Sequence, residues 1–355
     1  MVRMNEERLH DIISALPTRT VAVIGDFCVD RYFEIDPSIS DRSNETGLPI
    51  HQVVGVRAEP GGGANVLNNL AALGVGSVLP VGFLGLDGEG FELGRIFDRL
   101  GFERDGLQIL PDRHTPVFTK PVVIRPDGAP EELNRFDIFP REPLSEEQEA
   151  TLLEHLGAAF EAADALIVAD YGEAGKEGVV TARVRERVAE LARTQREKPV
   201  IADSRLHIDR FRQVIIKPNN FEAMEFLAGE RASPPTLTRL AEVGERAAER
   251  NRQPVLITLG PEGALLCAPG RALKIPVYPS EREGETDIVG AGDAVLAAVA
   301  ATLGAGAGVD EAVLIGMLVA SITIQEIGRC GSADPDQVHR RFREYAREFP
   351  DVVGD

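Results

Sequence analysis

The strongest candidate for a reactive group in this sequence is GAGD at 290–293, a glycine-alanine-glycine turn followed by a single acid. The turn leads into an apolar, alanine-rich stretch that is typical of a buried helix. Backbone N–H groups at a helix N-terminus form an anion site, and the helix dipole stabilises a carboxylate in the first turn. We therefore predict that Asp293 is an ionised proton acceptor at neutral pH, beside an anion cradle made by Gly290, Ala291 and Gly292.

This pairing suits the transfer of a phosphoryl group to a hydroxyl. A positioned base takes the hydroxyl proton, and fixed donors hold the charge that builds on the transferred group. The alternative is that Asp293 only complements the helix dipole as a helix-terminal residue. The turn lacks the Lys-Ser/Thr pair of a P-loop, so it is not a Walker A motif.

A second candidate pair lies in IIKPNNFEA at 215–223, where a predicted strand meets a predicted helix. Asn219 and Glu222 stand three residues apart there. An amide and a carboxylate could hold waters around Mg²⁺, which takes few protein ligands. The alternative is a capping box, in which Asn219 caps the helix and Glu222 is its partner at the third position.

Two glycine-rich stretches could each be either part of a binding site or a purely structural turn. In EPGGGANVLNNLAALG (59–74), glycines before a helix let a ligand approach the backbone, but they also suit a tight turn, and Asn65 is either a cap or a ligand contact. It is not a dinucleotide fingerprint, because no strand is predicted to run directly into it and no acid stands out downstream. TLGPEGALL (258–266) predicts a hairpin that could also lie along the phosphates of a nucleotide.

The elements that must position these residues alternate along the chain. Short apolar runs ended by Gly, Asp or Pro alternate with amphipathic helical stretches, which predicts an α/β fold with a doubly wound, mostly parallel sheet. Ligands bind outside the carboxyl ends of the strands in such sheets. The predicted strands are 21–26, 165–170, 199–203, 214–218 and 254–260, the helices are 145–163, 179–195 and 237–251, and polar strand ends are Asp26, Asp170, Asp203 and Lys217.

Two segments, 31–58 and 112–140, break this alternation with Pro, Gly and Asp turns between alternating β-branched residues. We predict that they form a small β-sheet lid over the active edge. No internal repeat or domain boundary is evident, so we expect one domain over 1–355. Exposed strand edges of a lid could pair with a second subunit, so we also expect a homodimer through the lid strands.

Composition excludes several classes of protein. The formal net charge is −19 with no long basic block, which speaks against binding to nucleic acid or to a membrane surface. No apolar run is long enough for a membrane span, and the N-terminus lacks the apolar segment of a signal peptide. Three widely spaced cysteines without a C-x-x-C motif favour a reduced, cytoplasmic protein. Six scattered histidines without H-E-x-x-H argue against a metalloenzyme.

The motifs, in their order, resemble the PfkB/ribokinase family of sugar kinases over roughly Val21 to Val338. TDIVGAGDAV is similar to the family's C-terminal signature, PGGGANVLNNLAALG to its N-terminal one, and KPNNFE carries its Asn-x-x-Glu. The resemblance implies a ribokinase-like fold with a lid, and the use of ATP and Mg²⁺. It departs at Val289 and Ala294, where relatives commonly have Thr.

The resemblance also implies roles for residues of this chain. Asp293 would be the base, with the Gly290–Gly292 backbone as anion hole. Asp287 and the carbonyl of Val289 would hold a monovalent cation, K⁺ for example. The sugar would meet Asp30, Gly61, Gly62 and Asn65; ATP and Mg²⁺ would be organised by Asn219 and Glu222, with Thr258, Gly260 and Gly263 lining the nucleotide site.

Within the family, the start VAVIGDFCVDRY and the stretch ADYGEAGKEG are most similar to the kinase half of the bifunctional ADP-heptose synthases. This implies heptose 7-phosphate as acceptor. A phosphorylated sugar needs a cationic clamp, for which the candidates are Arg31, Arg57, Arg135, Lys176 and Arg205. Two alternatives stay open: a kinase for another sugar, a nucleoside or a small alcohol, and a non-catalytic protein that binds sugar or nucleotide.

Overall fold

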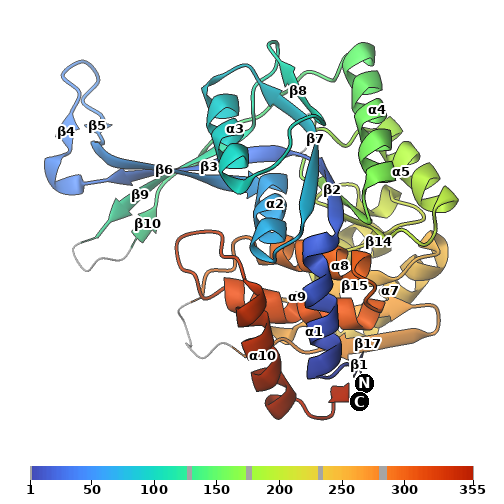
Figure 1. The fold of residues 1–355 in the computed structure, drawn as a ribbon. Coiled ribbons are helices and arrows are strands. Elements are labelled where there is room, and N and C mark those ends of the chain that lie inside the picture. The colour runs from blue at the N-terminus through green and yellow to red at the C-terminus, as the bar shows by residue number, and fades with distance from the viewer. Residues whose placement is uncertain (1, 126–129, 173–177, 231–234, 280–285, 355) are drawn as a thin grey trace.

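The computed structural model describes residues 2–125, 130–172, 178–230, 235–279 and 286–354, and within them a nine-stranded main sheet. Seven neighbouring strands are parallel and two antiparallel strands extend one edge (Figure 1). This confirms the predicted doubly wound, mostly parallel sheet. The spatial order is β17 (Arg271–Ile275), β16 (Ala264–Ala268), β15 (Val255–Thr258), β14 (Ile215–Ile216), β13 (Val200–Ser204), β12 (Ala165–Asp170), β2 (Thr20–Gly25), β7 (Ser77–Gly85), β8 (Leu107–Leu110).

Helices cover both faces of this sheet because its strands are apolar on both faces. Val21 and Val23 of β2 lie in one hydrophobic core, which also holds α1 (Glu6–Ala15), α2 (Gly63–Ala72), α3 (Gly88–Leu100), α8 (Ala291–Gly304), α9 (Val309–Thr323) and α10 (Pro335–Glu348). Ala22 and Ile24, which point the other way, lie in a second core with α4 (Glu146–Ala162), α5 (Ala182–Thr194) and α7 (Leu237–Asn251).

Caps fix where the predicted helices begin. Ser145 and Gln148 form a full capping box at the start of α4, and Thr236 accepts the N–H of Arg239 at the start of α7. Helix α7 has the predicted bounds, and it ends where Arg252 takes a left-handed φ of 59°. The helical periodicity of the sequence was therefore sufficient for these elements.

A second sheet forms the lid, which projects from the main body (Figure 1). Its order is β10-β9-β3-β6, with β11 pairing with β9, and the short β4–β5 hairpin lies at its far end. The bounds are β3 (Phe27–Ile35), β6 (Val53–Gly62), β9 (Val117–Ile124), β10 (Pro130–Glu132), β11 (Phe136–Ile138), β4 (Asp41–Arg42) and β5 (Pro49–Ile50). Strand β3 starts four residues before the predicted segment 31–58, and strand β6 ends four residues after it.

The prediction that no strand runs directly into the triple glycine is wrong. Lid strand β6 includes Gly61 and Gly62, and α2 begins at the next residue, Gly63. The sequence hid this strand end because glycine and proline are rare within strands. Strand β6 pairs antiparallel with β3 in the lid sheet, so the junction is still not that of a dinucleotide-binding unit.

The register of the parallel strands aligns their carboxyl ends. Ala169 of β12 lies opposite Gly25 of β2, and Asp170 lies opposite Ser204 of β13. Asp26, Asp170 and Asp203 therefore gather at one edge, as predicted for a ligand-binding edge. At the far end of the molecule β1 (Val2–Arg3) pairs with β18 (Val353–Gly354), so the first and last described residues are neighbours (Figure 1). Every helix within the described ranges is too short or too polar for a membrane span.

Candidate active site

The site is built around the start of α8. Gly290 is the N-cap with φ of 79°, and Asp293 is the third residue of the helix. The residues that follow, Ala294 to Ala301, are buried in the core, which anchors the helix. A Cβ at position 290 would lie 2.6 Å from Nδ2 of Asn65, so glycine is required there both by φ and by space.

Two side chains from distant segments hold the carboxylate of Asp293. Asn65 of α2 donates its Nδ2–H to Oδ2 over 2.9 Å, and Tyr171 donates its hydroxyl to Oδ1 over 2.6 Å. Asn65 in turn receives the amide of Asn69, which lies one helical turn further along α2. Asp293 is thus a fixed group rather than a mobile helix-terminal side chain.

Burial raises the pKa of Asp293 to about 6, while the hydrogen bonds from Tyr171 and Asn65 oppose this rise. The sequence interpretation expected the helix dipole alone to set this group. The structure shows that desolvation is the larger effect, although an acid with a pKa of about 6 is still mostly ionised at pH 7. A pKa close to neutrality is what a general base requires.

The first N–H groups of α8 are the predicted anion cradle. The N–H of Ala291 donates to the carbonyl oxygen of Ile288 over 3.2 Å and closes the turn. The following N–H groups have no acceptor within the helix, because the first turn of any α-helix leaves its donors unpaired. Gly292 is exposed, so this part of the cradle is open to an anion.

A buried cation stands beside the cradle. Lys217 pairs with Asp203 over 2.7 Å, and its Nζ lies 3.6 Å from where a Cβ on Gly292 would be. Burial opposes its charge, but Asp203, Glu222 and Asp293 outweigh burial, so the pKa of Lys217 is raised. The ammonium of Lys217 therefore interacts electrostatically with both Asp293 and Glu222.

Asn219 and Glu222 form the capping box that was the structural alternative. Oδ1 of Asn219 accepts the N–H of Glu222 and Oε2 of Glu222 accepts the N–H of Asn219, each over 2.8 Å. This box starts the short helix α6 (Asn220–Glu222). Burial, and next the nearby carboxylate of Asp203, raise the pKa of Glu222, while the N–H of Asn219 and the charges of Lys217 and Arg205 oppose the rise. Within the described ranges no cluster of three or more His, Cys, Asp or Glu side chains is placed to hold a metal.

The residues predicted to bind the nucleotide lie next to Asn219, at the carboxyl edge of the main sheet. Thr258, the last residue of β15, forms a parallel bridge with Asn219, so the two lie side by side. Gly260 starts a 3₁₀ turn and Gly263 ends it, and β16 then returns antiparallel to β15. The hairpin prediction is confirmed, and contact of this turn with a nucleotide stays a prediction.

Asp30 is buried on the lid and does not stand alone. Its Oδ2 accepts a hydrogen bond from Nζ of Lys120 over 2.9 Å, and Lys120 also reaches the hydroxyl of Tyr32. A Cβ on Gly61 would lie 2.5 Å from Oδ1 of Asp30, so the glycine backbone makes room for this carboxylate. Lys120, from β9, is a cation at the predicted sugar site that sequence reasoning missed.

Cys28 shows that the two halves of the site converge. Its Sγ lies against Gly61 and Gly62. Burial raises the pKa of this thiol, and both Asp30 and Asp293 add to the rise. Cys28 is therefore close enough to both the lid carboxylate of Asp30 and the carboxylate of Asp293 to be affected by their charges, and binding of a sugar between them stays a prediction.

Asp287, predicted to bind a monovalent cation, is held by backbone. Its Oδ1 accepts the N–H of Val289 and its Oδ2 accepts the N–H of Gly328, each over 3.0 Å. The carboxylate is fixed at the turn before α8. Carboxylate and carbonyl oxygens suit a hard cation, so the chemistry of this turn fits the predicted ion.

The predicted phosphate clamp is not assembled. Arg31 pairs with Glu89 and Glu92 of α3, and the other described candidates also have partners. Arg57 pairs with Glu59, Arg135 pairs with Asp137, and Arg205 lies over the ring of Tyr171. Lys176 lies outside the described residues. Each described candidate therefore already has a partner within the chain.

Tyr171 and Lys217 also belong to the site, and their contacts with Asp293 and Asp203 were not predicted from the sequence. The sequence indicates Lys217 only as the polar end of a strand. Tyr171 directly follows Asp170, the last residue of β12, and that position at the carboxyl edge was the available signal.

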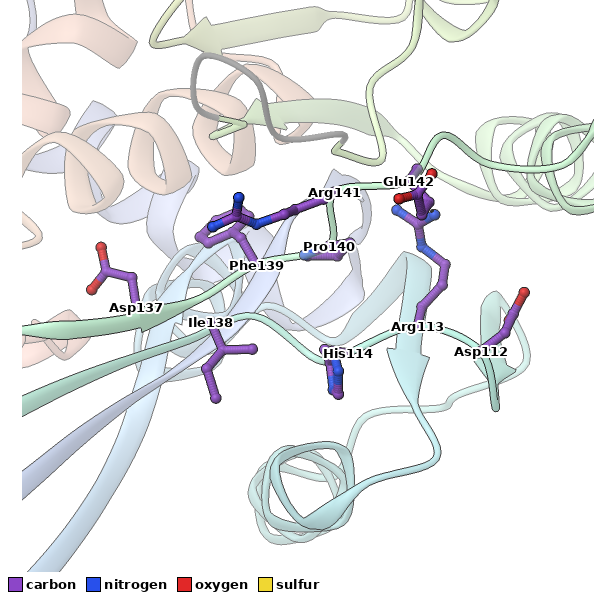
Figure 2. A pocket seen from close by; sticks show the side chains of 9 residues that line it. All are labelled: Asp112, Arg113, His114, Asp137, Ile138, Phe139, Pro140, Arg141 and Glu142. Atoms are coloured by element: carbon purple, nitrogen blue, oxygen red, sulfur yellow. Dashed lines mark hydrogen bonds between the residues drawn. The ribbon is translucent and has the colours of Figure 1, made fainter.

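A cavity of about 380 Å³ lies elsewhere, at the base of the lid. Residues 112–114 and 137–142 line it, and the side chain of Arg113 extends toward Glu142 (Figure 2). The guanidinium of Arg113 donates to the carbonyl oxygens of Glu142 and Pro143. None of the residues predicted for sugar or nucleotide binding lines this cavity.

Comparison with known proteins shows which family the chain belongs to. A family model described as "pfkB family carbohydrate kinase" matches residues 18–336. Two proteins named "Bifunctional protein HldE" are similar: that of Gluconobacter oxydans is 30% identical over 94% of this chain, and that of Bradyrhizobium diazoefficiens 31% over 87%. The chain spans only 65% and 60% of the length of these relatives.

Solved structures share the fold. A ribokinase of Arabidopsis thaliana, described as complexed with ribose and ATP, superposes with a TM-score of 0.68 at 19% identity, covering 92% of this chain and 99% of that one. Phosphofructokinase-2 of Escherichia coli, in complex with fructose-6-phosphate, gives 0.66 at 17% identity, covering 93% and 100%.

Proposed function

Because the chain belongs to the pfkB family of carbohydrate kinases, we propose that it transfers the γ-phosphoryl group of ATP to a hydroxyl of a sugar phosphate. The observation that carries the proposal is the carboxylate of Asp293, held by Asn65 and Tyr171 at the open N-terminus of α8. A base and an anion cradle on one helix start are what this reaction needs.

The steps follow from these positions. The acceptor binds between Asp30 on the lid and Asn65 on α2, with its hydroxyl at Asp293. Asp293 takes the hydroxyl proton as the oxygen attacks phosphorus, and the ADP oxygen leaves with the electron pair of the broken bond. The exposed N–H of Gly292 and the ammonium of Lys217 stabilise the charge on the transferred group.

ATP would lie along the edge from Asn219 to Gly263. Mg²⁺ would supply charge neutralisation of the phosphates when bound, and we propose that Asn219 and Glu222 orient its waters. Asp287 and the carbonyl of Val289 would hold a monovalent cation close to the anion cradle. These assignments are supported by the donor chemistry of the residues and by the position of Asn219 next to Thr258.

The acceptor that we propose is heptose 7-phosphate, with phosphorylation at the 1-hydroxyl. Its support is the likeness to proteins named HldE, and the match covers only part of their length. Lys120, close to Asp30, is the described cation best placed for an anionic sugar. We further propose a homodimer through the lid strands, and a cytoplasmic location in line with the free thiols of all three cysteines.

The test is release of ADP from MgATP across a panel of free sugars, nucleosides and sugar phosphates that includes heptose 7-phosphate. Asp293→Asn should lower turnover by roughly 100-fold or more, while sugar and nucleotide still bind. Asp310→Asn is the matched control, because Asp310 occupies the first turn of neighbouring helix α9. Turnover that survives in Asp293→Asn would remove Asp293 as base. Binding without turnover for the whole panel would favour a non-catalytic binding protein.

A further inference from the structure

Tyr171 occupies a position between two carboxylates. Its side chain is buried, and its hydroxyl lies 2.6 Å from Oδ1 of Asp293 and 3.3 Å from Oδ2 of Asp203. A phenol has one proton, so it can donate fully to one of them. Asp203 already receives the ammonium of Lys217 over 2.7 Å, and the shorter contact assigns the phenolic proton to Asp293.

The phenol remains a donor at every working pH. Burial, together with the charges of Asp293 and Asp203, raises the pKa of Tyr171 well above its usual value. It therefore stays neutral and protonated, and a neutral phenol next to a carboxylate donates a charge-assisted hydrogen bond.

The position of Tyr171 is fixed independently of Asp293. Its backbone N–H donates to Oδ2 of Asp26 over 3.0 Å, and Oδ1 of Asp26 accepts the N–H of Val179. The guanidinium of Arg205 lies 5.3 Å from the centre of the ring. The backbone and ring of Tyr171 thus have partners other than Asp293, which a group that orients another side chain requires.

We propose that Tyr171 is a positioning residue that holds the carboxylate of Asp293 in the orientation in which it takes the acceptor's proton. The inference rests on the proposed kinase function and adds a residue to it. Asn65 fixes Oδ2 and Tyr171 fixes Oδ1, so the two donors define the plane of the carboxylate. Each oxygen keeps a second lone pair, which leaves room for the substrate hydroxyl.

The hydrogen bond also has an electrostatic consequence with a definite sign. A donor to a carboxylate favours the ionised form, so Tyr171 lowers the pKa of Asp293 against the effect of burial. The other groups that face Asp293 are Asp203, Lys217, Cys28, Cys330 and Asn65. They remain in place when only the phenolic oxygen is removed.

The experiment is the pH profile of kcat for Tyr171→Phe, with saturating MgATP and the acceptor found in the panel. We expect the acid limb, set by Asp293 in the wild type, to move upward by roughly one pH unit. The plateau at high pH should fall by about 10-fold because the carboxylate is no longer held in its plane. The KM for the acceptor should change much less than kcat.

Tyr345→Phe is the matched control. It removes another buried tyrosine hydroxyl, which donates to the carbonyl oxygen of Pro276 over 3.0 Å. A structural loss alone would lower thermal stability in both variants and leave both pH profiles unchanged. An unshifted acid limb in Tyr171→Phe would overturn the inference.

A second variant covers the case in which Tyr171→Phe does not fold. A 3-fluorotyrosine placed at position 171 keeps the ring and strengthens the donor, so the acid limb should move downward; an unmoved limb would overturn the inference. Failure of the proposed function has a different signature. A wild type without turnover, or Asp293→Asn with normal turnover, removes the kinase assignment, whereas a normal wild type with unmoved profiles removes only the role of Tyr171.

Discussion

The amide of Asn65 donates to Oδ2 of Asp293 over 2.9 Å, and this bond joins residues that are 228 positions apart in the sequence. Asn65 comes from the helix that continues a lid strand, whereas Asp293 begins a helix of the main body. The proposed acceptor site and the proposed base are therefore linked by one direct hydrogen bond.

We predict that kcat falls on the acid side with a midpoint near pH 6. Burial raises the pKa of Asp293 to about 6, and the base works only when ionised. Turnover should be constant above pH 7 and should fall about tenfold per unit well below pH 6. Steady-state kinetics from pH 5 to 8 measure this, with circular dichroism to show that the protein stays folded. A flat profile down to pH 5 would contradict the predicted midpoint.

We predict that Gly290→Ala lowers kcat by roughly 10-fold or more. The new Cβ would lie 2.6 Å from Nδ2 of Asn65 and would push the amide off Asp293. The left-handed φ of 79° adds about 1–2 kcal/mol of strain.

Gly306→Ala separates these two effects. Gly306 has φ of 89°, but a Cβ there meets nothing within 4 Å. It should lose stability and keep kcat. Equal losses of kcat in the two variants would show that strain, not the contact with Asn65, is responsible.

We predict that Glu222→Gln raises the free Mg²⁺ needed for half-maximal activity by roughly 10-fold. The glutamine oxygen can still accept the N–H of Asn219, so the capping box and the melting temperature should be kept. Glu311→Gln makes the same change at the third residue of α9, where Glu311 accepts the N–H of the N-cap residue Gly308, and should not alter the Mg²⁺ requirement. An unchanged requirement in Glu222→Gln would leave Glu222 as a cap only.

We predict that Asp30→Asn raises the KM for the acceptor by roughly 10-fold and leaves the KM for MgATP unchanged. Asp30 is buried on the lid and pairs with Lys120, so its loss affects the acceptor side of the site. Asp137→Asn removes another paired lid carboxylate and should change neither constant. A rise in the KM for MgATP would place Asp30 elsewhere in the mechanism.

We predict a particle of twice the 38.4 kDa chain in sedimentation equilibrium. Among the described strands β6 is an edge of the lid sheet, and Val53, Val54 and Val56 on it are exposed. Val54→Lys should shift the mass toward the monomer. Ile109→Lys, on edge strand β8 of the main sheet, should not. A monomeric wild type would refute the dimer.

The sequence was informative where the signal is local. Apolar runs and caps located β2, β12 and the whole of α7, because side-chain periodicity and capping depend on neighbours in the chain. The strand predicted at 214–218 is only Ile215–Ile216 in the structure, since these two residues pair with β13 and only Ile216 also pairs with β15. The end of β6 was not predicted because it contains proline and glycine, which are rare within strands.

The contacts between site residues were not local and could not be predicted. Asp293 and Asp30 were found because their motifs are recognisable. Tyr171 meets Asp293 across 122 positions, and Lys120 meets Asp30 across 90. No periodicity links such pairs, so only the tertiary structure shows that the carboxylate of Asp293 is held by a phenol and that the carboxylate of Asp30 is paired with Lys120.

The continuity of β6 with α2 ties the geometry of the lid to that of the base. The strand and the helix share one uninterrupted backbone, with Gly62 as the last strand residue and Asn65 three residues later. If the lid tilts as a rigid sheet, it must either carry Asn65 with it or bend at Gly62, whose φ is 53°. A tilt of the lid that moves Asn65 would therefore weaken the hydrogen bond to Oδ2 of Asp293, while Tyr171, which is not part of the lid, would still hold Oδ1.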